Sequence, residues 1–213
     1  MATVVAFNGS PRPEGNTGIL LRTMLQGIGA EGIRTETVQI GGEKIRGCTA
    51  CGTCFKNRDR RCVFDDDVVN DCIQMMAEAD GFILGSPVYF TDITPEMKAL
   101  IDRAGYVSMA NGGLFQRKVG SAAIAVRRAG AVHAMDSILH FLLISGMVVP
   151  GLPPIGIGRE EGEVEKDSEG MSWARNAGRN MAWLLGQVKG NERNARREAS
   201  GRPERKPIRR QKR

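Results

Sequence analysis

Four of the five cysteines in this chain lie close together, in a segment whose spacing is C-x2-C-x2-C-x7-C. Four thiolates from one compact loop could bind a [4Fe–4S] cluster, since repeated x2 gaps let consecutive sulfurs reach neighbouring irons. A structural zinc site more often takes two C-x2-C pairs from opposite ends of a longer loop. The spacing therefore favours an iron–sulfur cluster over zinc, with free reduced thiols as the remaining alternative. The candidate metal ligands are Cys48, Cys51, Cys54 and Cys62.

Whether these cysteines could form disulfides depends on the compartment in which the protein is found. The N-terminal residues, MATVVAFNGSPRPEG, lack the basic region and long apolar core of a signal peptide. No stretch reaches the roughly 18 unbroken apolar residues that a membrane span needs. We therefore expect a cytoplasmic protein, and disulfides are disfavoured in that compartment. The fifth cysteine, Cys72, lies mid-helix among apolar residues and is expected in the core.

A second candidate site follows the first apolar run of the chain. The segment NGSPRPEGNTG, residues 8–18, has hydroxyls at Ser10 and Thr17, a cation at Arg12 and an amide at Asn16. An apolar-periodic helix begins at its end, and the free N–H groups of a helix N-terminus favour a phosphate. The segment matches neither G-x-x-x-x-G-K-[ST] nor G-x-G-x-x-G, so a monophosphate fits better than a triphosphate or an ordinary dinucleotide. A plain polar turn is the alternative.

Two further loops could complete that site. The first, GSPVYF, contains apolar and aromatic groups that suit a flat ring, although its two aromatic side chains could instead belong to the core. The second, VRRAG, supplies two arginines that would stabilise negative charge on such a ring; a solvated surface pair is the alternative. The residues concerned are Pro87, Val88, Tyr89 and Phe90 in the first loop, and Arg127, Arg128 and Gly130 in the second.

The elements that must position these loops alternate between strand and helix patterns. Apolar runs predict strands at residues 3–7, 34–40, 81–86, 118–126 and from residue 147, and helical periodicity predicts helices at residues 17–30, 66–79, 95–106, 131–145 and 168–189. Short apolar strands that each precede a helix predict an α/β fold, a doubly wound five-stranded parallel sheet with helices on both faces. Ligands of such sheets bind beyond the carboxyl ends of the strands, where the strand order reverses.

The net charge of +6 is unevenly distributed. Residues 190–213 carry ten Lys/Arg and three Asp/Glu, whereas residues 1–189 carry 20 Lys/Arg and 21 Asp/Glu. The basic segment has one aliphatic residue larger than alanine, Ile208, so burial cannot offset its ordering entropy and we expect a disordered tail. It has no aromatic residues to stack on bases, which argues against a nucleic acid partner. Residues 1–189 are expected to form one folded domain.

The motifs together point to a known family. GSPRPEGNT, then GSPVYF ahead of MKALIDR, resemble the NADPH-dependent FMN reductases, whose fold is flavodoxin-like. With CTACGTCF…C between them, the chain is similar to the iron–sulfur flavoprotein branch of that family. The resemblance covers residues 3–189, although the RRAG of the third loop differs from the glycine-rich version that many relatives carry. It implies that FMN is the cofactor, with its phosphate held by Ser10, Arg12, Asn16, Thr17 and Gly18, its isoalloxazine ring lined by Pro87, Val88, Tyr89 and Phe90, and Arg127, Arg128 and Gly130 across from the ring.

The resemblance also implies an activity. We expect an NAD(P)H-dependent flavin oxidoreductase in which the flavin performs the chemistry and no side chain acts as acid or nucleophile. A quinone or similar small molecule would accept the electrons. The alternative is an electron carrier between a ferredoxin-type partner and an unknown acceptor, working through a [4Fe–4S] cluster. A homodimer or homotetramer is expected; His133 could contact the flavin or substrate, and His140 is expected in the core.

Overall fold

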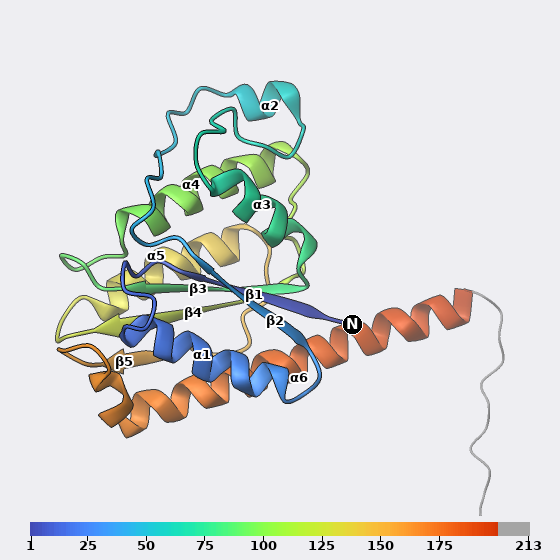
Figure 1. Cartoon of the computed structure of the whole chain (residues 1–213). Helices are drawn as coiled ribbons and strands as arrows, with labels where there is room; N and C mark the ends of the chain where they lie inside the picture. Colours follow the sequence, from blue (N-terminus) through green and yellow to red (C-terminus); the bar gives the residue numbers. More distant parts are fainter. Residues whose placement is uncertain (200–213) are drawn as a thin grey trace, which may run out of the picture.

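One sheet of five parallel strands forms the centre of the molecule (Figure 1). The computed structural model describes the backbone of residues 1–199 and the side chains of residues 1–188. The strands are β1 (Thr3–Asn8), β2 (Arg34–Gln39), β3 (Gly81–Pro87), β4 (Val119–Val126) and β5 (Ile155–Ile157). Their order is β2-β1-β3-β4-β5, which reverses between β1 and β3 and leaves a crevice beyond the carboxyl ends of these strands. The predicted flavodoxin-like, doubly wound sheet is confirmed.

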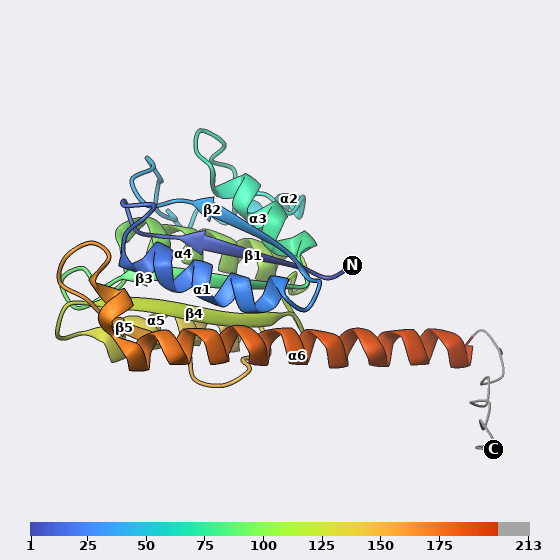
Figure 2. The same ribbon diagram turned by 60° about the horizontal axis from the view of Figure 1, so that its bottom comes forward.

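Helices cover both faces of this sheet (Figures 1 and 2). They are α1 (Asn16–Gly29), α2 (Thr53–Asn57), α3 (Val69–Glu78), α4 (Pro95–Ala110), α5 (Ala131–Ile144), the 3-10 helix η1 (Glu163–Lys166) and α6 (Ser168–Ala199). The side chains of α1 and α6 form one apolar cluster against the sheet, and those of α3, α4 and α5 form the other. The short helix α2 was not predicted; it lies in the long segment between β2 and α3 and packs on α4.

The central strands are apolar because both of their faces are covered. Every residue of β4 is buried, and so is β1 after its first residue. Beneath α4 and α5, the Phe82 ring contacts the rings of Phe7, Phe115 and Phe141, with centroid distances of 5.5–6.4 Å. Truncation of a buried phenylalanine to alanine costs about 3–5 kcal/mol. The loops at the carboxyl edge are therefore attached to a densely packed scaffold.

The fifth strand lies later in the chain than the sequence predicts. The apolar run from Met147 forms no strand; Val148 makes one isolated bridge to Val119, and the Pro150-Gly151 pair follows at once. β5 instead pairs with residues 124–126 of β4. The prediction of a strand from Met147 is therefore wrong, and the residues after β5 reach the carboxyl edge of the sheet.

α6 continues ten residues beyond Lys189, the predicted end of the helix and of the folded domain. It packs closely on α1 at Gly178, where a Cβ would lie 2.4 Å from the Met24 carbonyl oxygen. Beyond this crossing the helix runs past the sheet (Figure 2). The predicted disordered tail thus begins within a helix, and its residues 200–213 lie outside the described part of the chain. Among the described helices, none combines the length and hydropathy that a bilayer crossing requires.

Candidate functional site

The three predicted loops meet at one pocket of about 130 Å³ beyond the carboxyl ends of β1, β3 and β4. The expected cofactor-binding residues that line it are Ser10, Arg12, Asn16, Thr17, Pro87, Val88, Tyr89 and Arg127. Those outside its lining are Gly18, Phe90, Arg128 and Gly130. The structure brings the loops together, while the ligand contact of each residue stays a prediction.

The N-terminus of α1 opens on this pocket. Its N-cap residue, Gly15, provides no side-chain hydrogen bond to the first turn. The Thr17 hydroxyl oxygen is buried and has no hydrogen-bond partner among the described residues. Leaving a buried polar group unpaired costs about 1–3 kcal/mol, which a ligand oxygen at this position would relieve. Together with the free N–H groups and the helix dipole, the hydroxyl makes this end of the pocket fit a phosphate.

Ser10 and Arg12 shape the turn that faces the helix end. The Arg12 N–H donates to the Ser10 hydroxyl at 3.2 Å, and the Ser10 N–H donates to the Asn8 carboxamide oxygen at 3.1 Å. From β2, the Gln39 amide donates to the Ser10 carbonyl at 2.5 Å. The Arg12 side chain is exposed and forms no ion pair with any described residue. Its guanidinium is therefore available to an anionic ligand.

Asn16 and Gly18 have structural roles that their sequence context does not reveal. The Asn16 carboxamide makes hydrogen bonds of 2.9–3.3 Å to the backbone of residues 158–164, which form the loop after β5. Its side chain is thereby occupied, and only its backbone N–H remains for a phosphate. A Cβ at Gly18 would lie 2.0 Å from the Pro13 carbonyl oxygen, so glycine is required for this close passage of the chain.

The loop after β3 forms a tight hairpin at the pocket wall. Tyr89 and Asp92 form an antiparallel bridge, and the intervening Phe90 and Thr91 have positive φ angles of 47° and 75°. Such left-handed conformations cost about 1–3 kcal/mol for residues other than glycine and occur where the surrounding structure enforces them. The Phe90 side chain is fully exposed at the tip, whereas Tyr89 lines the pocket.

Asp92 attaches this hairpin to α5. Its carboxylate accepts a hydrogen bond from the Ser137 hydroxyl at 2.8 Å and lies 3.4 Å from His133 Nε2. Partial burial raises the pKa of Asp92, but a backbone N–H, Ser137 and His133 together lower it below its usual value. Gly130, with φ of 90°, begins α5 beneath the hairpin, where a Cβ would lie 2.6 Å from the Thr91 Cα. His133 thus supports the hairpin and is not among the residues lining the pocket.

The wall formed by the loop after β5 was missed from the sequence. Gly158, Arg159 and Glu161 line the pocket, and they reach it because β5 is the strand beside β4. A Cβ at Gly158 would lie 2.7 Å from the Val164 backbone nitrogen, which explains the glycine. The sequence would have revealed these residues only if the fifth strand had been placed correctly. His140, expected in the core, is exposed on α5.

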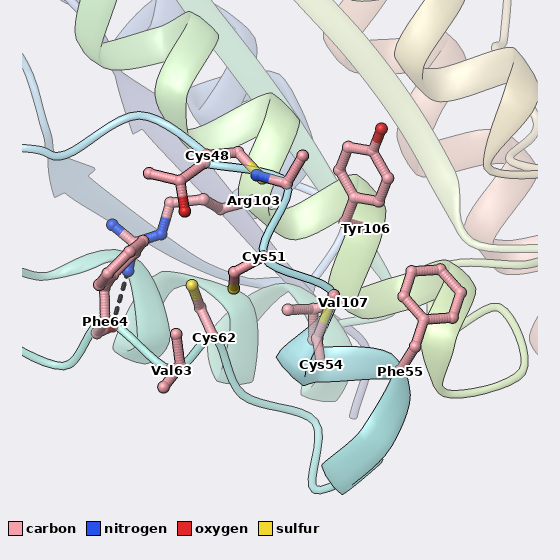
Figure 3. Close-up of a pocket in the computed structure, with 13 residues that line it drawn as sticks. Cys48, Cys51, Cys54, Phe55, Cys62, Val63, Phe64, Arg103, Tyr106 and Val107 are labelled. Atoms are coloured by element: carbon pink, nitrogen blue, oxygen red, sulfur yellow. Dashed lines mark hydrogen bonds between the residues drawn. The ribbon is translucent and has the colours of Figure 1, made fainter.

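The four clustered cysteines line a second pocket, of about 200 Å³, between the segment after β2 and α4 (Figure 3). Figure 3 shows the sulfurs of Cys51 and Cys62 turned toward each other, although neither forms a disulfide. Apolar side chains, including Phe55, Val63 and Tyr106, form much of the remaining wall. Cys72 lies apart on α3 and is buried, as predicted. The two pockets share no lining residue.

This donor set fits a polynuclear cluster better than a single ion. Among the described residues, no three Cys, His, Asp or Glu side chains lie close enough to share one metal ion. Tetrahedral zinc needs all of its sulfur ligands about 2.3 Å from one centre. In a [4Fe–4S] cube each thiolate binds a different iron, so the four sulfurs surround a wider space. The donor chemistry, four thiols lining one pocket, is therefore compatible with a [4Fe–4S] cluster.

Two buried polar residues that support the cysteine segment were also missed. Asn70, 2% exposed, accepts a hydrogen bond from the Cys62 N–H at 2.7 Å and donates to the Cys62 and Phe64 carbonyls at 3.0 Å. Arg103 of α4 is 1% exposed and lines the cysteine pocket. The available signal was a charged residue on the apolar face of α4, one residue before the buried Ala104. An arginine on such a face needs a specific partner.

Comparisons with a family model and with individual proteins point to the same family. Residues 2–160 match the family described as NADPH-dependent FMN reductase. An iron-sulfur flavoprotein of Methanocaldococcus jannaschii is 35% identical over 195 residues, covering 87% of this chain and 98% of the relative. An iron-sulfur flavoprotein of Methanosarcina thermophila is 32% identical over 192 residues, covering 88% of this chain and 97% of the relative.

Solved structures agree in fold. RosB, in a crystal structure with bound 8-demethyl-8-formylriboflavin-5'-phosphate, superposes with a TM-score of 0.70 at 18% identity, covering 100% of this chain and 96% of RosB. A flavodoxin from the domain Archaea gives a TM-score of 0.55 at 16% identity, covering 87% of this chain and 99% of the flavodoxin. At these identities the likeness establishes the flavodoxin-like fold alone.

Proposed function

Because the chain belongs to the NADPH-dependent FMN reductase family, we propose that it is an FMN-dependent oxidoreductase that takes electrons from NAD(P)H. The observation that carries this proposal is the buried hydroxyl of Thr17 at the N-terminus of α1, which has no hydrogen-bond partner among the described residues. It lies in the pocket at the strand-order reversal, where flavodoxin-like sheets bind their ligands. The sheet and its ligand-binding edge thus support the same cofactor as the family.

The phosphate end of the pocket accounts for binding. Thr17 would donate its hydroxyl hydrogen, the first turn of α1 its N–H groups, and Arg12 a positive charge. The Ser10 hydroxyl, which accepts from the Arg12 N–H, still has its own hydrogen to donate. The backbone at Ser10 and at the start of α1 is fixed by Gln39 and by the close packing at Gly18 before any ligand arrives. Preorganisation of this kind increases affinity because little ordering remains to be done.

The other end of the pocket accounts for orientation. Pro87, Val88 and Tyr89 offer an apolar wall to a flat ring, and Arg127 offers a positive charge to negative charge that develops on it. When bound, FMN supplies the hydride and single-electron chemistry. A ring bound there would lie beside the strained hairpin, which Asp92 connects to α5 through its hydrogen bond with Ser137. No proton-transferring side chain is assigned to the pocket.

A second candidate function is favoured by the cysteine pocket. We propose that Cys48, Cys51, Cys54 and Cys62 hold a [4Fe–4S] cluster, which would supply one-electron transfer. The relatives named iron-sulfur flavoproteins, which match nearly their full length, support this assignment. With such a cluster the chain would act as an electron carrier between a ferredoxin-type donor and an acceptor, rather than as a reductase of a quinone-like small molecule.

An exposed apolar surface beside the cysteines supports a partner at this site. Phe55, Tyr106 and Met109 are 40%, 46% and 60% exposed, and the first two are in edge-to-face contact. Large exposed apolar side chains that gather in one place are typical of interaction surfaces. We propose that a redox partner or a second copy of the chain, in a homodimer or homotetramer, covers this surface.

One anaerobic preparation of the full chain tests both functions. We expect a flavin absorbance spectrum with about one FMN and about four irons and four sulfides per chain. Rapid bleaching of the flavin by NADPH in chelator-treated, iron-free protein would support the reductase. Reduction by a ferredoxin-type protein alone, and only with iron present, would support the carrier. A colourless preparation that binds no added FMN would refute both.

A further inference from the structure

Arg103 occupies an unusual position for a charged residue. Its side chain is completely buried, and it extends from α4 to the two arms of the cysteine segment (Figure 3). We propose that Arg103 is a positioning residue that holds these arms together and donates a hydrogen bond toward the sulfurs of the cysteine pocket, thereby stabilising a bound cluster in its reduced state. This inference rests on the cluster proposed above for the same cysteines.

Arg103 forms a clamp between the two arms of the cysteine segment. Nη1 of Arg103 donates to the Arg46 carbonyl at 3.1 Å, and Nη2 donates to the Phe64 carbonyl at 2.8 Å. Arg46 lies two residues before Cys48, and Phe64 lies two residues after Cys62. One guanidinium therefore joins the chain where it enters the motif to the chain where it leaves. Lysine could not replace it, because a single ammonium lacks the planar, multiply donating fork.

Arg103 also has a buried donor that no described group accepts. Asp67 pairs with Nη1, and its side chain is 3% exposed, so the guanidinium is neutralised on that side. Nε of Arg103 is buried and has no hydrogen-bond partner among the described residues. Buried N–H groups without an acceptor are rare in native proteins. Since Arg103 lines the same pocket as Cys48, Cys51, Cys54 and Cys62, we expect the missing acceptor to be a sulfur atom of a group bound there.

The charge of Arg103 matters as well. A guanidinium stays protonated in proteins, so Arg103, as a lining residue, brings a fixed positive charge to the cysteine pocket. One-electron reduction of a cluster adds negative charge to this pocket. Hydrogen bonds to the sulfurs and nearby positive charge are among the factors that raise cluster reduction potentials. Removal of Arg103 should therefore make reduction harder.

Two variants of the full-length protein separate this role from simple loss of folding. Arg103→Lys keeps a cation near Asp67 but removes Nε and the clamp. Arg103→Gln combined with Asp67→Asn removes both charges and leaves no buried ion unpaired. Arg46→Gln is the matched control. The guanidinium carbon of Arg46 lies 4.7 Å from the centroid of the Phe64 ring, and that of Arg103 lies 5.9 Å from it, but the Arg46 side chain is 54% exposed.

The readouts are iron per chain, the rate of iron loss to a chelator, the midpoint potential of the cluster, FMN content and the melting temperature. Both Arg103 variants should keep FMN, lose iron about 10- to 100-fold faster, as is usual when a residue supporting a metal ligand is removed, and show a lower midpoint potential. Arg46→Gln should resemble the wild type in each readout.

The outcomes that overturn the inference are distinct from those that overturn the cluster. Wild-type protein without iron or sulfide removes the cluster, and this inference with it. A wild type that contains the cluster, with unchanged potential and iron retention in Arg103→Lys, overturns the role of Arg103 alone. If the double variant does not fold, the iron retention and midpoint potential of Arg103→Lys alone test the role of Arg103. A potential that falls equally in Arg46→Gln would show a general charge effect and would also overturn the specific role.

Discussion

Asp67 and Arg103 form an ion pair with side-chain exposures of 3% and 0%, between the segment before α3 and the middle of α4. We expect Asp67→Ala to destabilise the fold by about 3–5 kcal/mol, because it leaves a buried guanidinium without its counter-charge. Urea unfolding measures this difference. Asp66→Ala is the control, since the Asp66–Arg46 pair is more than half exposed and worth at most about 1 kcal/mol. Equal effects of the two changes would contradict the expectation.

The same carboxylate predicts a loss of stability in acid. Burial raises the pKa of Asp67, but hydrogen bonds from Arg103 and from two backbone N–H groups outweigh it and lower the pKa. An unfolded Asp has a pKa of about 3.9, so this stabilisation is complete above that value and is lost as the pH falls through the folded pKa. Unfolding free energies between pH 6 and pH 2 should fall less steeply in Asp67→Asn than in the wild type. Parallel pH profiles would exclude Asp67 as a source of the acid sensitivity.

Flavin binding should depend on Thr17. Thr17→Asp puts a negative charge where a phosphate is expected, so the variant should fold but be purified nearly colourless. Thr17→Val removes only the unpaired hydroxyl and should weaken FMN binding by roughly tenfold, the equivalent of about 1.4 kcal/mol. Thr23→Val is the control on the same helix, where the hydroxyl donates to the Ile19 carbonyl at 2.9 Å. Wild-type flavin content in Thr17→Asp would refute the phosphate assignment.

Iron content should depend on the clustered cysteines and not on Cys72. Cys54→Ser should lose most of the iron and keep FMN, because the two pockets share no lining residue. Cys72→Ser should keep its iron, since burial raises the pKa of Cys72 to about 12 and holds it as a protonated thiol within the α3 core. Iron analysis and absorbance spectra distinguish these cases. Full iron in Cys54→Ser would remove that residue from the ligand set.

The protein should become more stable when the hairpin after β3 carries residues that favour positive φ angles. Phe90 and Thr91 have the positive φ angles at which Asn and Gly are favoured. Phe90→Asn combined with Thr91→Gly should therefore raise the free energy of unfolding by about 1 kcal/mol, because the left-handed conformation is less costly for these residues. Thermal unfolding of the flavin-free protein measures this effect. A decrease would indicate that the two side chains make contacts worth more than the strain.

The sequence predicted the layered sheet because β1, β3 and β4 are short apolar runs whose pattern is local. It predicted that the three loops meet because parallel strands bring their carboxyl ends to one edge. It misplaced β5, whose three residues carry little pattern, and with it the wall at residues 158–161. A short run can be identified as a strand only by its pairing partner, which local periodicity does not contain.

The residues that support the site were harder to predict for a related reason. Arg103 bonds to groups 36 to 57 positions away, and Asn16 bonds to groups 142 to 148 positions away. Neither pairing leaves a trace in the spacing of neighbouring residues. The four cysteines could be identified from the sequence because they lie at short spacings within one segment. The roles of Arg103 and Asn70 follow only from the tertiary fold.

The length of α6 separates Arg193, Arg196 and Arg197, near its C-terminal end, from the predicted flavin pocket. The helix starts close to the pocket wall after β5, and at a rise of 1.5 Å per residue its 32 residues span about 48 Å. The last residue of α6, Ala199, therefore lies several Debye lengths from that wall, since at physiological ionic strength one such length is about 8 Å. An anion that approaches the pocket meets a nearly neutral domain and the local field of Arg12 and Arg127, so the isoelectric point of about 9.3 is a poor guide to how fast anionic ligands associate there.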